Sequence, residues 1–113
     1  MTIPAIQLFN SANDLTSEGK EILDHVANFL KSYPDKKVAT QGHTDNKGKA
    51  AANQVLSEKR AQRVREYLVF YQNISPNRIT AEGLGATQPA AANTSEAGRA
   101  LNRRIELIVS MGE

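Results

Sequence analysis

The chain contains no cysteine and no tryptophan, and aromatic residues make up only 5% of its 113 positions. Without cysteine it can form neither a disulfide framework nor a cysteine-based zinc site, and two histidines alone cannot complete one. The scarcity of aromatic rings argues against a platform for single-stranded nucleic acid, which stacks bases on such rings. No apolar run approaches the ~20 residues of a membrane-spanning helix. We therefore expect no metal and no cofactor.

The composition that remains is ordinary for a folded domain, with 40% hydrophobic and 23% charged residues. This length supports one hydrophobic core, so we predict a single domain over residues 1–113. Fourteen basic and 12 acidic residues give a net charge of +2, but all seven arginines lie from Arg60 onward. Because arginine binds carboxylate and phosphate with a planar fork, an anion is expected to bind the second half. The alternative is a solvated basic surface.

The hydrophobic pattern alternates between strand-like and helix-like segments. Strands are predicted at residues 6–9, 37–41, 78–82 and 103–109. Helices are predicted from Thr16 or Ser17 to Pro34, over 51–72, and from Thr94 or Ser95 to about Leu101. This β-α-β-α-β-α-β order indicates an α/β (α+β) two-layer sandwich, with a mixed four-stranded sheet covered by two main helices. The other sheet face should be partly exposed or used in assembly.

An arginine lies in the apolar stripe predicted for the second helix. Leu56, Val64, Tyr67 and Tyr71 form that stripe, and Arg60 falls in its middle with Asn53 on the same face. A buried guanidinium requires acceptors, and Asp45 is the only acid between Asp35 and Glu58. The two charges could form a buried ion pair that fixes the loop at residues 42–49. Alternatively, they could flank a pocket for a zwitterion, with an ammonium at Asp45 and a carboxylate at Arg60.

Three motifs resemble those of the OmpA-like C-terminal domain, and the resemblance extends from about Phe9 to Val109. They are GHTD at 42–45, NxxLSxxRA at 53–61 and GRAxNRRIE at 98–106. The resemblance implies a periplasmic module that binds peptidoglycan non-covalently through the meso-diaminopimelate of its stem peptide. By the same resemblance, Asp45 receives the ammonium and Arg60 the carboxylate of that residue.

The resemblance also extends the predicted site. Asn53 and Arg103 match positions expected to line it, and Thr44 and Asn46 flank Asp45. Arg104 is expected to pair with a nearby acid for structural reasons, and His43 is expected to pack within the loop or to form a hydrogen bond there. Members of this family usually carry a barrel, a lipid anchor, a transmembrane helix or another domain. We therefore expect a piece of a longer envelope protein, attached to a membrane only through parts outside this sequence.

Three other functions are alternatives to peptidoglycan binding. A nucleic-acid partner is disfavoured because glutamates interrupt the basic residues and leave no basic face. A cell-wall hydrolase would need a nucleophile, a metal or paired carboxylates, and Asp45 has no acidic neighbour in sequence, so we predict no enzyme. The remaining alternative is a protein-protein interaction module that keeps the OmpA-like fold with Asp45–Arg60 as a structural ion pair.

Overall fold

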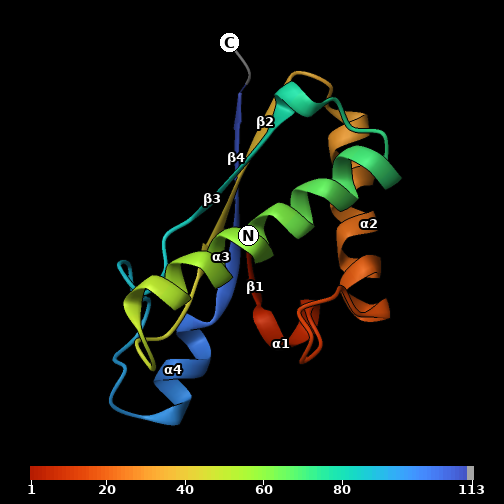
Figure 1. Ribbon diagram of the computed structural model, residues 1–113. Helices are drawn as coiled ribbons and strands as arrows, with labels where there is room; N and C mark the ends of the chain where they lie inside the picture. The colour runs from red at the N-terminus through yellow and green to blue at the C-terminus, as the bar shows by residue number, and fades with distance from the viewer. Residues whose placement is uncertain (112–113) are drawn as a thin grey trace.

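A mixed four-stranded sheet forms the centre of the computed structural model, which describes residues 1–111 (Figure 1). The strand order is β1-β4-β2-β3, with β4 antiparallel to both β1 and β2, and β2 parallel to β3. The elements in chain order are β1 (Thr2–Pro4), α1 (Ala5–Leu8), α2 (Ser17–Ser32), β2 (Lys36–His43), α3 (Ala50–Glu66), a π-helical turn (Tyr67–Tyr71), a 3-10 turn (Pro76–Arg78), β3 (Ile79–Gly83), α4 (Glu96–Asn102) and β4 (Arg104–Met111). The predicted two-layer α+β fold with a mixed sheet is confirmed.

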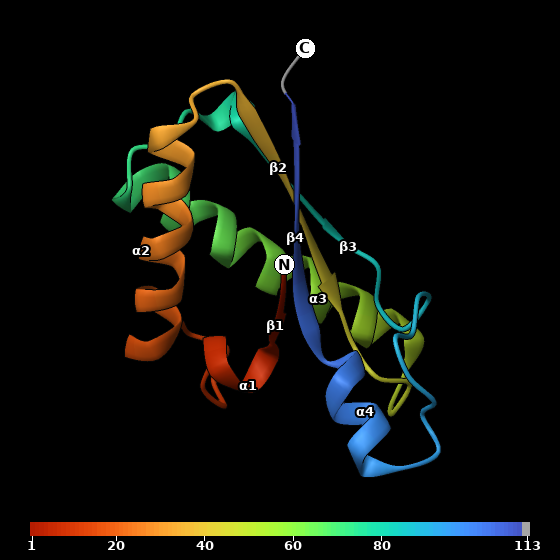
Figure 2. The ribbon, with the colours of Figure 1, turned by 180° about the vertical axis from the view of Figure 1, so that it is seen from behind.

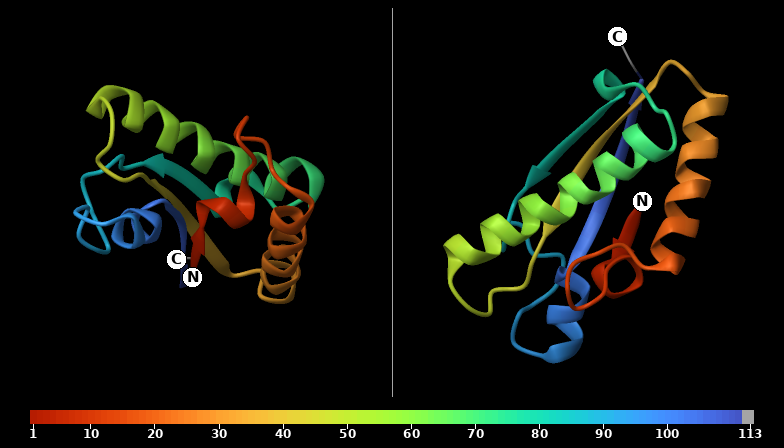
Figure 3. Two further views of the ribbon diagram at one scale, coloured as in Figure 1. Left: turned by 90° about the horizontal axis from the view of Figure 1, so that it is seen from below. Right: turned by 45° about the vertical axis from the view of Figure 1, so that its right-hand side comes forward.

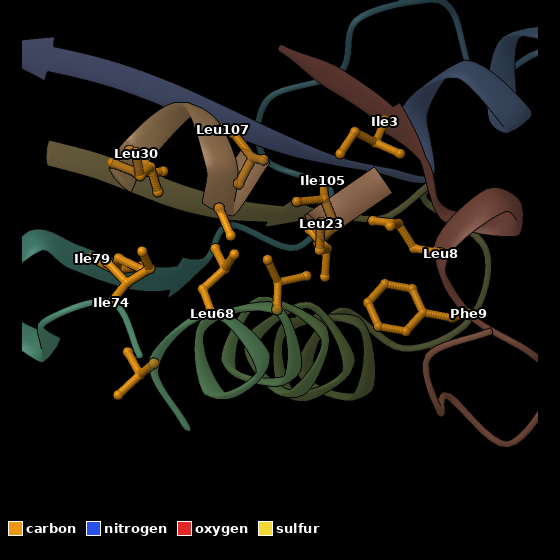
Figure 4. Packing of buried hydrophobic residues seen from close by; sticks show 14 of the residues in the cluster. Ile3, Leu8, Phe9, Leu23, Leu30, Leu68, Ile74, Ile79, Ile105 and Leu107 are labelled. Carbon is orange, nitrogen blue, oxygen red and sulfur yellow. The ribbon is translucent and has the colours of Figure 1, made fainter. Parts of the chain in front are cut away.

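The long helices α2 and α3 cover the same face of the sheet (Figures 1 and 3). Between them and the strands lies the core, in which Leu23 and Leu30 of α2 meet Leu68 and Leu107 (Figure 4). Helix α2 begins where the sequence predicts, because the Thr16 hydroxyl accepts a hydrogen bond from the Gly19 N–H at 2.9 Å. From behind, the other sheet face is uncovered over most of its length, and α4 lies at one end (Figure 2).

The strand predicted at residues 6–9 is wrong. Residues 5–8 form the short helix α1, and the edge strand β1 precedes it, with Ile3 opposite Ile105 of β4. Leu8 is fully buried whereas Ile6 is 87% exposed, an arrangement that a four-residue segment with three apolar residues does not reveal. Such a segment fits a buried strand and a helical turn equally well, and contacts elsewhere in the fold decide between them.

The predicted core-facing stripe of the second helix is right at Val64 and partly so at Tyr67, but the buried face is rotated by about one residue from the prediction at Leu56 and Tyr71. The buried residues of α3 are Ser57, Ala61 and Val64, whereas Leu56 is only half-buried and Tyr71 is 76% exposed. Small residues such as Ser57 and Ala61 are not recognised as part of an apolar stripe in the sequence, although they allow a helix to approach a sheet closely. Arg60 therefore lies beside the core-facing side of α3 and is half-buried.

Two glycines on neighbouring strands bring α3 against the sheet. A Cβ atom at Gly42 of β2 would overlap the backbone carbonyl of Ser57, and one at Gly83 of β3 would overlap the backbone at Glu58. The backbone of α3 thus rests on the strands at the end where β2 runs into the loop carrying Asp45. This contact fixes the position of α3, and with it Arg60, relative to that loop.

Candidate functional site

Three charged side chains from distant parts of the sequence gather at one end of the sheet. Asp45 lies in the loop between β2 and α3, Arg60 on α3, and Arg103 at the junction of α4 and β4. This is the end at which α1 and α4 also lie (Figure 1).

The loop that carries Asp45 is held by its own hydrogen bonds. Asn53 donates its amide to the carbonyl oxygens of Asp45 at 3.3 Å and Lys47 at 2.9 Å, and the Thr44 hydroxyl donates to the Asp45 carbonyl at 2.9 Å. The Thr44 N–H donates to the carbonyl of Gly85 at 2.9 Å. Thr44 and Asn53 therefore shape the loop, whereas Asn46 is exposed to solvent.

Both carboxylate oxygens of Asp45 are engaged. Oδ1 accepts the backbone N–H of Lys47 at 3.0 Å, and Oδ2 accepts Nη1 of Arg103 at 2.7 Å. Burial by itself raises the pKa of Asp45, but the Arg103 and Lys47 hydrogen bonds and charges outweigh it, so the pKa lies below the usual 3.8. Asp45 is thus a buried, ionised carboxylate that needs a cationic partner.

Arg103 is that partner, and it also contacts a second acid. Its Nη1 binds Asp45, and its Nη2 binds Oε1 of Glu96 at 2.8 Å. Glu96 occupies the first turn of α4, whose N-terminus is capped by the Ser95 hydroxyl. The hydrogen bond to Glu96 and then that to Asp45 raise the pKa of Arg103. An Asp45–Arg60 ion pair is not formed within residues 1–111, because Arg103 occupies the position expected for Arg60.

Arg60 has no acidic partner within the part of the chain that the structure describes. Its Nε donates to Oδ1 of Asn13 at 3.0 Å, and its guanidinium lies 5.4 Å from the centre of the Phe9 ring. Burial lowers the pKa of Arg60, the charge of Arg103 lowers it further, and the charge of Asp45 opposes both. The two terminal nitrogens of Arg60 therefore remain available to a ligand.

Asn13 and the ring of Phe9 are site residues that the sequence reasoning did not assign to Arg60. Asn13 has a positive φ of 63° and ends a turn in which Oδ1 of Asn10 accepts the N–H groups of Ala12 and Asp14. The spacing of two asparagines around a tight turn predicts this local geometry. It does not predict that the turn folds against α3.

A cavity of about 300 Å³ opens beside Arg60. Its walls include the apolar side chains Ala5, Ile6, Phe9 and Ala100, with Arg60 and Arg103 as its charged members. Asp45 is not among the lining residues and lies in contact with Arg103. The cavity thus combines two guanidinium groups with an apolar wall, which suits a carboxylate attached to a short hydrocarbon chain.

A separate buried polar cluster lies next to this site. Arg104 pairs with Glu106 at 3.0 Å, which confirms the structural pairing predicted for it. His43 is 2% exposed, and neither of its ring nitrogens forms a hydrogen bond to the described residues. Burial first, and then the charge of Arg104, lower its pKa from 6.5, while Glu106 opposes them. His43 is therefore a neutral side chain packed at the end of β2; the predicted packing role is met, but it lies in the strand and not in the loop, and the hydrogen-bonding role is not met within residues 1–111.

Neither a metal centre nor a membrane helix is found in residues 1–111. No group of three or more potential metal-ligating side chains occurs among them. None of their helices has both the length and the apolarity needed to cross a bilayer.

The chain belongs to the OmpA family, whose pattern matches residues 9–103. It is 48% identical over 85 residues to outer membrane porin F of Pseudomonas fluorescens, covering 75% of this chain and 26% of the porin. It is 41% identical over 101 residues to the peptidoglycan-binding protein ArfA of Mycobacterium bovis, covering 89% of this chain and 31% of that protein. The chain thus spans about a quarter to a third of these relatives.

The fold is shared with solved structures. The cell wall anchor of the T6SS from Pseudomonas aeruginosa superimposes with a TM-score of 0.85 at 36% identity, covering 99% of this chain and 80% of that one. The resemblance inferred from the three motifs is therefore confirmed at the level of family and fold.

Proposed function

We propose that this chain binds peptidoglycan non-covalently by recognising the side-chain end of meso-diaminopimelate in the stem peptide. In this proposal Arg60 holds the carboxylate and Asp45 receives the ammonium. The observation that carries it is the half-buried Arg60, whose only hydrogen-bond acceptor among the described residues is the neutral Asn13. A guanidinium kept ionised beside a cavity, without an acid, is suited to bind a ligand's anion.

The size and chemistry of the cavity support this ligand. About 300 Å³ admits a single amino-acid side chain with its terminal groups but not a folded macromolecular surface. The methylene chain of diaminopimelate would lie against Phe9 and Ala100, with its carboxylate toward Arg60. Thr44 and Asn53 would hold the Asp45 loop in place. Asn46, exposed in the same loop, would contact the ligand.

The names of the relatives agree with an anchoring role. One is described as a peptidoglycan-binding protein, another as an outer membrane porin, and a third as a cell wall anchor. We propose that this chain is a single domain, with its motif-bearing part at about 9–109, that attaches a longer envelope protein to the wall on the periplasmic side. Binding requires no bond to break, so the proposal includes no catalytic step and no cofactor.

The test is a calorimetric titration of the chain with three stem peptides. They carry at position three meso-diaminopimelate, lysine, which lacks the side-chain carboxylate, or 2-aminopimelate, which lacks the side-chain ammonium. We expect saturable binding to the diaminopimelate peptide, no measurable binding to the lysine peptide, and weaker binding to the aminopimelate peptide. Equal binding to the first two would refute the role of Arg60.

The absence of binding to all three peptides would favour a protein-protein interaction module. In that case the Asp45–Arg103 pair would be a structural ion pair, in place of the Asp45–Arg60 pair suggested by the sequence. An Asp45→Asn variant separates the roles of the two charges. It should bring the affinities for the diaminopimelate and aminopimelate peptides close together while retaining discrimination against lysine.

A further inference from the structure

The carboxylate proposed to receive a ligand ammonium is already occupied by a cation of the chain. Arg103 Nη1 lies 2.7 Å from Oδ2 of Asp45, and the Lys47 N–H takes Oδ1. In this state the charged groups that line the cavity are Arg60 and Arg103. An incoming ammonium would therefore meet two positive charges, while an incoming carboxylate would be attracted.

Arg103 is held in a way that allows it to move. Its side chain is 36% exposed, whereas that of Asp45 is only 11% exposed. Its second partner, Glu96, is 62% exposed on the first turn of α4. If Arg103 left Asp45, its guanidinium could stay paired with the exposed Glu96. The arginine would then not become an unpaired buried charge. Asp45, by contrast, is a buried carboxylate and needs a cationic partner both with and without a ligand.

We propose that Arg103 is a displaceable internal cation: it neutralises Asp45 in the free chain and gives up this carboxylate to the ligand ammonium on binding. This inference rests on the proposed function. In it, Arg103 competes with the ligand ammonium for Asp45, whereas the sequence predicted only that Arg103 lines the site. Arg103 keeps the buried carboxylate paired when no ligand is bound, and it reduces the net gain from a ligand's ammonium because one ion pair replaces another.

The consequence is a coupling between the ligand ammonium and Arg103, which a cycle of two chains and two ligands can measure. The diaminopimelate and 2-aminopimelate peptides differ only in that ammonium. The affinity for the diaminopimelate peptide divided by that for the aminopimelate peptide is the affinity ratio. Calorimetry measures this ratio for the wild-type chain and for Arg103→Gln, which removes the charge and keeps a polar side chain. We expect the ratio to rise at least about 5-fold in Arg103→Gln, because Asp45 is then free for the ligand.

The control is Arg63→Gln on α3, which removes an arginine whose ion pair with Asp14 lies on the surface. This variant should leave the affinity ratio at its wild-type value. Thermal unfolding of each variant checks that the fold is intact. An independent readout is the guanidinium NMR signal of Arg103, which should shift on addition of the diaminopimelate peptide and stay nearly unchanged with the aminopimelate peptide.

Three results would overturn the inference, and they separate it from the proposed function. If Arg103→Gln weakens both peptides by the same factor, Arg103 is a ligand contact and only the inference fails. If the Arg103 signal is unmoved when diaminopimelate binds, the exchange does not occur. If the wild-type chain and Arg103→Gln bind neither peptide, the proposed function fails, and the inference fails with it.

Discussion

Replacing Arg60 by alanine should remove ligand binding while leaving the chain folded. In the free protein the substitution deletes one hydrogen bond to Asn13, worth about 1 kcal/mol, and the contact with the Phe9 ring, worth about 0.5–1 kcal/mol. It also releases the cost of holding a half-buried charge, which offsets part of that loss. We expect the free energy of unfolding to fall by no more than about 2 kcal/mol, or roughly 8 °C in Tm.

The effect on binding should be larger than the effect on stability. Removing one member of a desolvated, hydrogen-bonded charge pair costs about 2–5 kcal/mol. The lower end of this range corresponds to about a 30-fold increase in Kd for the diaminopimelate peptide. The assay pairs calorimetric titration with thermal unfolding of the same samples. Near-normal binding, or an unfolded Arg60→Ala chain, would contradict this prediction.

A matched control lies one turn further along α3. Arg63 pairs with Asp14 at 3.3 Å, but both side chains are more than half exposed. Arg63→Ala should therefore change stability by less than about 1 kcal/mol and leave Kd unchanged. A comparable loss of binding in Arg63→Ala would indicate that Arg60 acts through the general positive charge of the helix and not through a specific contact.

Two further predictions concern the scaffold. Gly42→Ala should lower the free energy of unfolding by about 3 kcal/mol, because its Cβ would overlap the Ser57 carbonyl on α3. Gly48→Ala is its control in denaturant unfolding, since it meets no atom within 4 Å and should cost about 1 kcal/mol for its positive φ; equal losses would contradict the close packing of α3. The second prediction is that stability decreases as pH falls below 6.5, because the lowered pKa of His43 makes the folded state bind fewer protons than the unfolded state there. Urea unfolding at pH 7.5 and 5.5 should show this loss of stability in the wild-type chain and in the exposed-site control His25→Gln, but a smaller loss in His43→Gln. If His43→Gln lost as much stability as the wild type, a group other than His43 would be responsible.

Much of the fold follows from local patterns in the sequence. The apolar residues of α2 recur at helical spacing, and the Thr16 hydroxyl caps the helix by accepting the N–H of Gly19, three residues on. The helix and its start are therefore predictable. Residues 6–9 do not share this property. Their run is too short to carry a period, and the burial of Leu8 under α2 determines their helical turn.

The charged members of the candidate site could be predicted from the sequence, but their pairings and the neutral contacts of Arg60 could not. Arg60 stands out because a charge within an apolar stripe needs a partner, and Asp45 because it is the only acid between Asp35 and Glu58. Which partner Asp45 takes depends on where α4 delivers Arg103, 58 residues away in sequence. The role of Asn13 was missed because its contact with Arg60 spans 47 residues.

The family, the order of most elements and the three charged residues that gather at one end of the sheet could thus be predicted from the sequence alone. These depend on periodicity, capping and motif spacing, which are properties of neighbouring residues. Which face of α3 meets the sheet, and which arginine pairs with Asp45, could be seen only in the folded chain. Both depend on how closely backbones approach one another, and here glycine and small side chains set that approach without leaving an apolar pattern along the chain.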